Sequence, residues 1–280
     1  MGKLLAAIDY HPASATALRA LLPLRRALRD TLVVYHAYQL PRGLPFLSPH
    51  IIEKMEREAE TEEQQKMRLF LSEQVPAAER RGIRLLAQRE FPSEGVERHL
   101  EEGNYSLLAV GAQGTEEEEQ GALGFHSRYF IHHSPIPTLV TFPESVITWK
   151  RVLVAYDSQY RSLRGMRFLR RLAERAQSEI VGLAMIRPSA SIDKLHKRLQ
   201  RMTHASSYTR VVWDGPHLVR LLSETARSYG ADVIALFSPS KQVVEGMRQL
   251  TMAELSGHAA WLFLPSSADA GGTSDESIEE

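Results

Sequence analysis

Residues 107–140, LLAVGAQGTEEEEQGALGFHSRYFIHHSPIPTLV, carry the pattern that decides the predicted fold. An apolar run ends in a loop containing Gly111 and Gly114, a short helix is predicted to begin near Gly124, and a second apolar run follows. Glycines let the backbone approach a ligand closely, and the first N–H groups of a helix have no partner within it. The stretch is therefore predicted to be strand, loop, helix and strand, with an arrangement suited to binding an anion.

The same alternation extends outward over the whole chain. Apolar runs predict strands at residues 3–9, 31–37, 83–89, 105–110, 138–142, 151–157, 180–186, 208–213, 232–237 and 260–264. Helical spacing predicts helices at 13–28, 51–75, 162–176, 192–203, 216–229 and 243–255, and one from Ser93, which we expect to cap it. Strands alternating with helices indicate an α/β fold with a parallel sheet, helices on both faces and a ligand at the carboxyl ends of the strands.

The glycine spacing G-x2-G-x9-G, followed by HHSPIPTLV, resembles the nucleotide-binding segment of the universal stress protein family. The strand LLAAID, which ends at Asp9, and its repeat VLVAYD at 152–157 extend the resemblance over nearly the whole chain. It implies two tandem flavodoxin-like or adenine-nucleotide α-hydrolase-like domains, each a five-stranded parallel sheet. We place them at residues 1–145 and 150–265, and expect a disordered tail, rich in Gly, Ser and acids, at 266–280.

The resemblance also implies a binding site in the first half for ATP or AMP, with or without Mg²⁺. Asp9 would face adenine, with backbone near Ala37 closing the other side; the alternative is an Asp that only forms a turn. The phosphates would meet the loop and the start of the helix. The candidate residues there are Gly111, Gln113, Gly114, Gly124, Phe125, His126 and Ser127.

Two features depart from what the family would lead us to expect. Phe125 stands where the family usually has Ser or Thr, although its backbone N–H remains available. Glu116 to Glu119 would repel phosphates if they faced them, by roughly 2 kcal/mol per charge pair at about 8 Å. These glutamates either face solvent, which we favour, or hold a divalent cation, or the site prefers a less charged ligand such as AMP.

Other candidate sites are weaker. His126, His132 and His133 are interpreted as structural rather than metal ligands, because adjacent helical residues project about 100° apart. In the second half, Phe237 and Ser240 align with Gly111 and Gly114, so we expect no ordinary nucleotide site there and a structural role for Asp157.

On the helix at 51–75, glutamates are expected on the outer face. The residues expected on its buried side are Met55, Met67, Leu69, Phe70 and Leu71.

Composition narrows the class of protein. The 280 residues include no cysteine, which excludes disulfides and thiolate chemistry, and no apolar run long enough to span a bilayer. With no signal-peptide pattern at residues 1–11, we expect a cytoplasmic protein.

The helix at 162–176 carries a basic stripe, which we interpret as a solvated face; nucleic-acid binding is not expected. Its members are Arg164, Arg167, Arg171 and Arg175.

No phosphate-binding G-x-x-x-x-G-K loop, nucleophile elbow or zinc helix supports an enzyme. The sequence therefore favours an adenine-nucleotide sensor in the stress response, whose second half is degenerate. The alternatives are a protein-interaction module that has lost nucleotide binding and, more weakly, a slow ATPase. The resemblance implies association through the last strand, and because the last strands here, 138–142 and 260–264, are both apolar, they would pair the halves as a pseudo-dimer. A homodimer and an unknown protein partner are also open.

Overall fold

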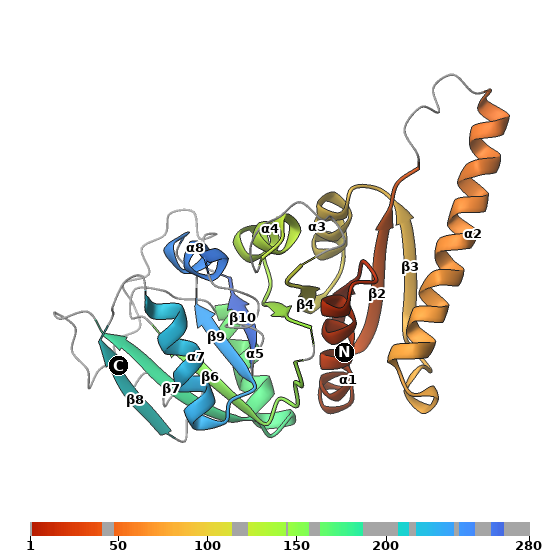
Figure 1. The fold of residues 1–280 in the computed structure, drawn as a ribbon. Helices are drawn as coiled ribbons and strands as arrows, with labels where there is room; N and C mark the ends of the chain where they lie inside the picture. The colour runs from red at the N-terminus through yellow and green to blue at the C-terminus, as the bar shows by residue number, and fades with distance from the viewer. Residues whose placement is uncertain are drawn as a thin grey trace, which may run out of the picture.

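The computed structural model describes residues 2–40, 48–113, 123–143, 145–156, 163–186, 207–212, 217–237, 241–249 and 259–265. Within these ranges, ten strands form one continuous sheet in the order β3-β2-β1-β4-β5-β10-β9-β6-β7-β8, with helices on both faces (Figure 1). The predicted α/β class is confirmed. None of the helices described is both long enough and apolar enough to cross a bilayer.

The elements follow the predicted order, and every expected strand is present within two residues of its predicted bounds. The first half contains β1 (Lys3–Ala7), α1 (Pro12–Leu28), β2 (Thr31–Tyr38), α2 (Pro49–Gln74), the 3₁₀ turn η2 (Ala77–Glu79), β3 (Arg84–Arg89), α3 (Pro92–Glu102), β4 (Tyr105–Gly111), α4 (Phe125–His133) and β5 (Thr138–Thr141). The second half contains β6 (Arg151–Tyr156), α5 (Leu163–Arg175), β7 (Glu179–Ile186), β8 (Ser207–Val212), α7 (Leu218–Tyr229), β9 (Val233–Phe237), α8 (Lys241–Gln249) and β10 (Ala260–Leu264).

One predicted helix is not tested by the structure, and the predicted start of another is corrected. The helix expected at 192–203 lies outside the described residues. The predicted cap at Ser93 is wrong: α3 begins one residue earlier, at Pro92, after the N-cap residue Phe91, which makes no side-chain capping bond. Proline suits the first position of a helix because it has no N–H to leave unpaired there.

The strands within each half pair in parallel, and the two halves join through their last strands. β5 and β10 run antiparallel, with Val140 opposite Trp261. Both strands are buried along their whole length, as is usual for apolar strands covered on both faces. The expected pairing of the last strands is therefore present, and neither strand is an exposed edge.

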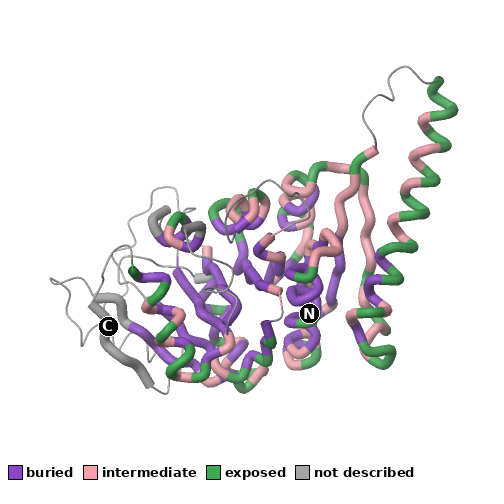
Figure 2. The backbone as a smooth tube through the Cα atoms, viewed as in Figure 1, coloured by how far each residue is buried: buried purple, intermediate pink, exposed green. Residues whose placement is uncertain are grey.

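The helices form two layers, and each layer spans both halves. One core lies between the sheet and α1, α2 and α5; the other lies between the sheet and α3, α4, α7 and α8. Figure 2 shows that the strands in the middle of the sheet are largely buried, and every residue of β5 and β10 at the junction is buried.

The connection from β5 to β6 is packed into the first of these cores. Ile147 and Trp149 are buried there. The indole Nε1 of Trp149 donates a hydrogen bond to the carbonyl oxygen of Ala20 in α1, at 2.7 Å. Pro23 lies one turn further along α1, where its missing N–H leaves the helix one hydrogen bond short. The predicted boundary at 145–150 falls in this connection, and the division into two domains stays a prediction.

The basic stripe of α5 is only partly a solvated face. Arg171 donates from Nη2 to Oδ2 of Asp30 in the first half, at 2.8 Å, and the side chain of Asp30 is 1% exposed. Arg164 donates from Nη1 to the carbonyl oxygen of Pro135, at 2.9 Å, also in the first half. The interpretation of the stripe as solvated is therefore wrong for Arg171, whereas Arg164 is exposed as expected and also contacts the first half.

Helix α2 is long and only half packed. Met67, Phe70 and Leu71 are buried as predicted, but Leu69 is 62% exposed, so its assignment to the buried side is wrong. The N-terminal part of α2 extends beyond the edge of the sheet and is mostly exposed (Figures 1 and 2). Its packed end lies beside β3 and reaches the site described next.

Candidate functional site

A cavity of about 950 Å³ opens at the carboxyl ends of β1, β2 and β4. This is the edge at which open parallel sheets place their ligands. Of the nine predicted binding residues, eight line this cavity: Asp9, Ala37, Gly111, Gln113, Gly124, Phe125, His126 and Ser127. The ninth, Gly114, lies outside the described residues. The fold thus brings together residues that are more than one hundred positions apart in the chain.

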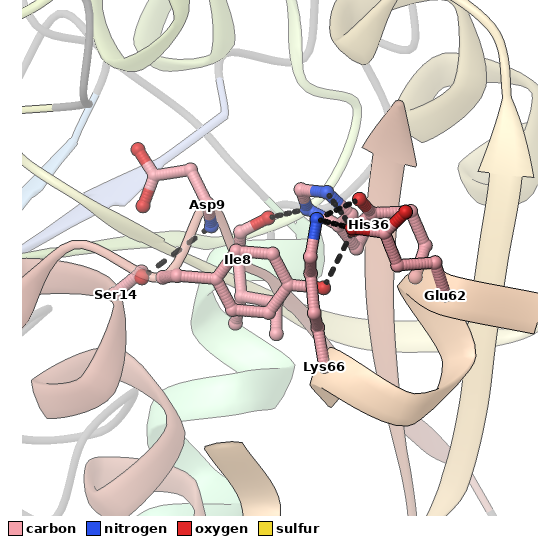
Figure 3. A network of polar contacts seen from close by, with 8 residues as sticks. Ile8, Asp9, Ser14, His36, Glu62 and Lys66 are labelled. Atoms are coloured by element: carbon pink, nitrogen blue, oxygen red, sulfur yellow. Dashed lines mark hydrogen bonds and ion pairs between the residues drawn. The ribbon is translucent and has the colours of Figure 1, made fainter. Parts of the chain in front are cut away.

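Asp9 follows β1 and belongs to a tight turn at the start of α1. Its Oδ1 accepts a hydrogen bond from the backbone N–H of His11 at 3.1 Å, and its own N–H donates to Oγ of Ser14 at 3.4 Å. The side chain of His11 in turn caps α1 by accepting from Ala13 N at 3.2 Å. In Figure 3 the Asp9 carboxylate extends away from His36 and Lys66. Asp9 is therefore both a turn residue and a wall of the cavity.

Tyr10, which sequence reasoning missed, has an unusual backbone conformation. Its φ of 65° is in the left-handed region, which costs a bulky residue roughly 1–2 kcal/mol. Its side chain offsets that strain: the hydroxyl donates to Oε2 of Glu63 at 3.2 Å, and the ring packs on His36 and Phe70 at centroid distances of 4.4 and 5.5 Å. Burial, with Glu63 close by, raises the pKa of the Tyr10 phenol.

The contact between β2 and α2 forms a polar network on the same side (Figure 3). His36 donates from Nδ1 to the carbonyl oxygen of Ile8 at 2.8 Å, because a carbonyl only accepts, and its Nε2 lies 3.4 Å from Oε2 of Glu63. Lys66 lies 2.8 Å from Glu62 and 2.9 Å from Glu63, and these hydrogen bonds raise the pKa of its ammonium group. The prediction that the glutamates of α2 lie on its outer face is therefore wrong for Glu63.

At the other side of the cavity, α4 begins with its N–H groups directed out of its first turn. Gly124 is the N-cap residue, and the first helical bond is donated by Arg128 to Gly124. The N–H groups of Phe125, His126 and Ser127 precede that bond. His126 Nδ1 is buried and has no hydrogen-bond partner in the structure. A polar ligand would be expected to bind these N–H groups and the ring nitrogen of His126.

Ser127 and Gly111 each have a structural role that limits what they can contribute to ligand binding. The hydroxyl of Ser127 donates to the carbonyl oxygen of Gly111 at 2.6 Å, so its hydrogen is already used. A Cβ on Gly111 would lie 2.8 Å from the backbone N of Ser14 and 3.0 Å from the carbonyl carbon of Ala13. Gly111 is therefore required for the close packing of β4 on α1, whatever it does toward a ligand.

The start of α3 is fixed by a second polar network. The hydroxyl of Tyr35 donates to Oε1 of Glu90 at 2.8 Å, and Arg98 donates to the same oxygen at 2.7 Å. Burial and the bond to Glu90 raise the pKa of the Tyr35 phenol. Gly95 makes room for this pair, since a Cβ there would lie 1.8 Å from the Tyr35 hydroxyl. Phe91, next to Glu90, is thus held at the cavity's edge.

In the part of the chain that the structure describes, no group of three or more His, Asp or Glu side chains could hold a metal ion. Glu116 to Glu119, the residues considered for a divalent cation, lie outside it. The described residues therefore do not assign a site for Mg²⁺.

Three comparisons bear on the identity of the chain. The model of the universal stress protein family matches residues 1–141. A universal stress protein from Archaeoglobus fulgidus has a similar structure, with a TM-score of 0.65 and 17% identity, over 96% of this chain and 97% of that one. A putative universal stress protein from Pseudomonas aeruginosa gives a TM-score of 0.55 and 14% identity, over 94% and 93% of the two chains.

No curated protein matches the chain by sequence. At these identities the similar structures establish the shared fold, and the family model establishes the family, since it covers half of the chain. The family model matches the half that contains the cavity and the glycines of the opening stretch. On this evidence, the chain belongs to the universal stress protein family.

Proposed function

We propose that the first half binds an adenine nucleotide in the cavity and that the chain is a nucleotide-responsive regulatory protein of the stress response, acting in the cytoplasm. One observation carries the proposal. Eight residues expected from the family's nucleotide-binding pattern line a single cavity at the carboxyl edge of the sheet. Its volume of about 950 Å³ falls within the range of small-molecule sites.

The geometry suggests an orientation for the ligand. The Asp9 carboxylate would accept from the adenine amino group, and the backbone near Ala37 would close the other side. The phosphate would then lie at the start of α4, where the N–H groups of Phe125, His126 and Ser127 are directed. The orphaned Nδ1 of His126 supports a polar ligand in this place.

The charges in the cavity favour AMP over ATP. Among the described residues that line it, Lys66 is the one with a fixed positive charge, and it is already paired with Glu62 and Glu63. Each additional phosphate charge would therefore gain no unpaired cation from these residues, while the carboxylates of Asp9 and Glu63 would repel it.

In the second half we propose that no nucleotide binds. Phe237, which aligns with Gly111, ends β9 and is buried, so a bulky side chain fills the position where the first half has none. The second half would then serve as the structural partner of the first, as the shared sheet suggests.

Titration calorimetry with AMP, ATP and GMP on the full chain tests the proposal. We expect one AMP site, weaker ATP binding, and a loss of at least about tenfold in AMP affinity for Asp9→Asn, since a hydrogen bond to a charged group contributes roughly 1.5–3 kcal/mol. Asp157→Asn, the same change at the matching position of the second half, is the control and should bind as the wild type does.

Absence of binding by any nucleotide up to millimolar concentration would reject the proposal in favour of the interaction module. Release of inorganic phosphate from ATP, which we do not expect, would instead support the slow ATPase.

A further inference from the structure

The cavity has two chemically different sides. The side formed by α1, α2 and the ends of β1 and β2 is polar and is lined by Asp9, Tyr10, His36, Gln39, Glu63 and Lys66. The side formed by α3 and α4 is largely apolar and is lined by Phe91, Pro92, Val96, Phe125 and Phe130. An adenine nucleotide by itself would satisfy the first side and leave much of the second uncovered.

Two phenylalanines make the apolar side unusual. Phe91 is 58% exposed and Phe125 is 56% exposed, although both line the cavity. Phe91 precedes α3 and Phe125 begins α4. These two helices are neighbours, joined by a hydrogen bond of 2.5 Å from the Tyr129 hydroxyl to Glu97. Covering these two side chains with an apolar group would remove their apolar surface from water, which favours binding.

The polar groups near Phe125 suit a phosphate of low charge. Among the described residues they include the N–H groups of the first turn of α4, the unpartnered Nδ1 of His126 and the amide of Gln113, while the Ser127 hydroxyl is committed to Gly111. With no lining cation at this end among the described residues, a singly charged phosphodiester would be accepted more readily than a doubly charged monoester.

We propose that the ligand is an adenosine 5′-phosphodiester whose second ester group is apolar, either alkyl or aryl. Adenine lies on the polar side of the cavity, the singly charged phosphate lies at the start of α4, and the apolar group covers Phe91 and Phe125. This assignment rests on the proposed nucleotide site and specifies the chemical class of its ligand.

Calorimetry of the full chain with AMP, the methyl ester of AMP and the benzyl ester of AMP tests the proposal. The two esters carry the same charge and differ in the size of the apolar group. We expect the benzyl ester to bind at least about tenfold more tightly than the methyl ester, which corresponds to about 1.4 kcal/mol. Phe91→Ser and Phe125→Ser, made separately and together, should each reduce the ratio of methyl-ester to benzyl-ester dissociation constants.

Leu69→Ser, which changes an equally exposed apolar residue outside the cavity, is the matched control and should keep the full preference. Because the two phenylalanines are more than half exposed, their variants should melt near the wild-type temperature, and either one alone suffices for the test.

Three outcomes would overturn the proposal. If AMP binds but the two esters bind equally, the ligand class is wrong while the nucleotide site stands. If the preference for the benzyl ester survives in the double Phe variant, the apolar group does not lie on these residues. If neither AMP nor the esters bind, the proposed function fails together with this inference.

Discussion

Gly111 lies at the end of β4, against the first turn of α1, and its role can be tested directly. Gly111→Ala would place a methyl group 2.8 Å from the backbone N of Ser14, so α1 or β4 must shift. We expect the free energy of unfolding to fall by about 1–3 kcal/mol, the usual range for overpacking. Urea denaturation measures this change.

The control for this prediction is Gly246→Ala in α8. There the added Cβ would meet only a side-chain methyl of Val219, at 3.3 Å, and alanine favours helix more than glycine does by roughly 1 kcal/mol. The control variant should therefore be at least as stable as the wild type. Equal stability of Gly111→Ala and the wild type would show that β4 and α1 can separate without cost.

At the scale of single residues, the sequence identified residues that belong to the family's pattern, but not the other residues that line the cavity beside them. Asp9 and the glycines around residues 111–124 were found because they form a pattern along the chain. Tyr10 and His36 were missed because their roles depend on tertiary contacts with Glu63 of α2, which no local spacing encodes. The left-handed backbone of Tyr10 is likewise held by those contacts and not by its residue type.

Among the elements, α2 is the one whose parts should differ most in stability. Spanning 26 residues, it is about 39 Å long, but its buried side chains are Met67, Phe70 and Leu71, all in the C-terminal half. The N-terminal half has exposed ion pairs, such as Arg57 with Glu53, which contribute only a few tenths of a kcal/mol each.

We therefore predict that the amides of residues 50–62 exchange with solvent deuterium far faster than those of residues 66–74. An isolated helical segment of this length is marginal in water, and local opening needs no loss of core contacts. Hydrogen exchange followed by mass spectrometry of peptides measures the difference. Uniform protection along α2 would mean that another surface covers its N-terminal half.

The assignment of faces on α2 shows where sequence reasoning fell short. Met67, Phe70, Leu71 and Glu63 follow helical spacing and share one side, whereas Leu69 lies on a different side. Strict attention to this spacing would have placed Glu63 inward and Leu69 outward. Hydrophobicity alone suggested Leu69 inward and Glu63 outward. An inward carboxylate needs partners, and besides Lys66 on the same helix these are Tyr10 and His36, which only the fold brings near.

For the whole molecule, the contact between Arg171 and Asp30 should make the halves mutually dependent. Among the described residues, Arg171→Met would leave the buried Asp30 carboxylate with its hydrogen bonds from Gly2 and Ser106. Because a buried carboxylate that loses its cation is costly, and because Arg171 is partly exposed, we expect a loss of about 2 kcal/mol in the free energy of unfolding.

Arg167→Met, at an exposed position of the same helix, is the matched control and should change the stability by less than about 0.5 kcal/mol. Asp30→Asn combined with Arg171→Met should recover part of the loss, since the uncompensated charge is removed. Equal effects of the two arginine variants in urea denaturation would show that the contact between the halves contributes nothing.

The order of elements could be predicted because apolar periodicity and the repeat are visible along the chain, and the pairing of the last strands because the family resemblance implies it. The connections between the halves could not. Trp149 and Arg171 bind groups more than one hundred residues away, and nothing near either residue in the sequence identifies Ala20 or Asp30 as its partner. The arginine stripe looks the same in sequence whether its members face water or the other half.

The reversal of direction between β5 and β10 separates the two halves in one important respect. Strands β1–β5 end at one edge of the sheet, and strands β6–β10, which run the other way, end at the opposite edge. The carboxyl ends of β6 and β9 therefore lie at the edge of the sheet opposite the cavity, and so does a substitution made directly after either strand. Changes at the carboxyl ends of the second half's strands can therefore leave both the cavity and the buried strands of the junction unaltered.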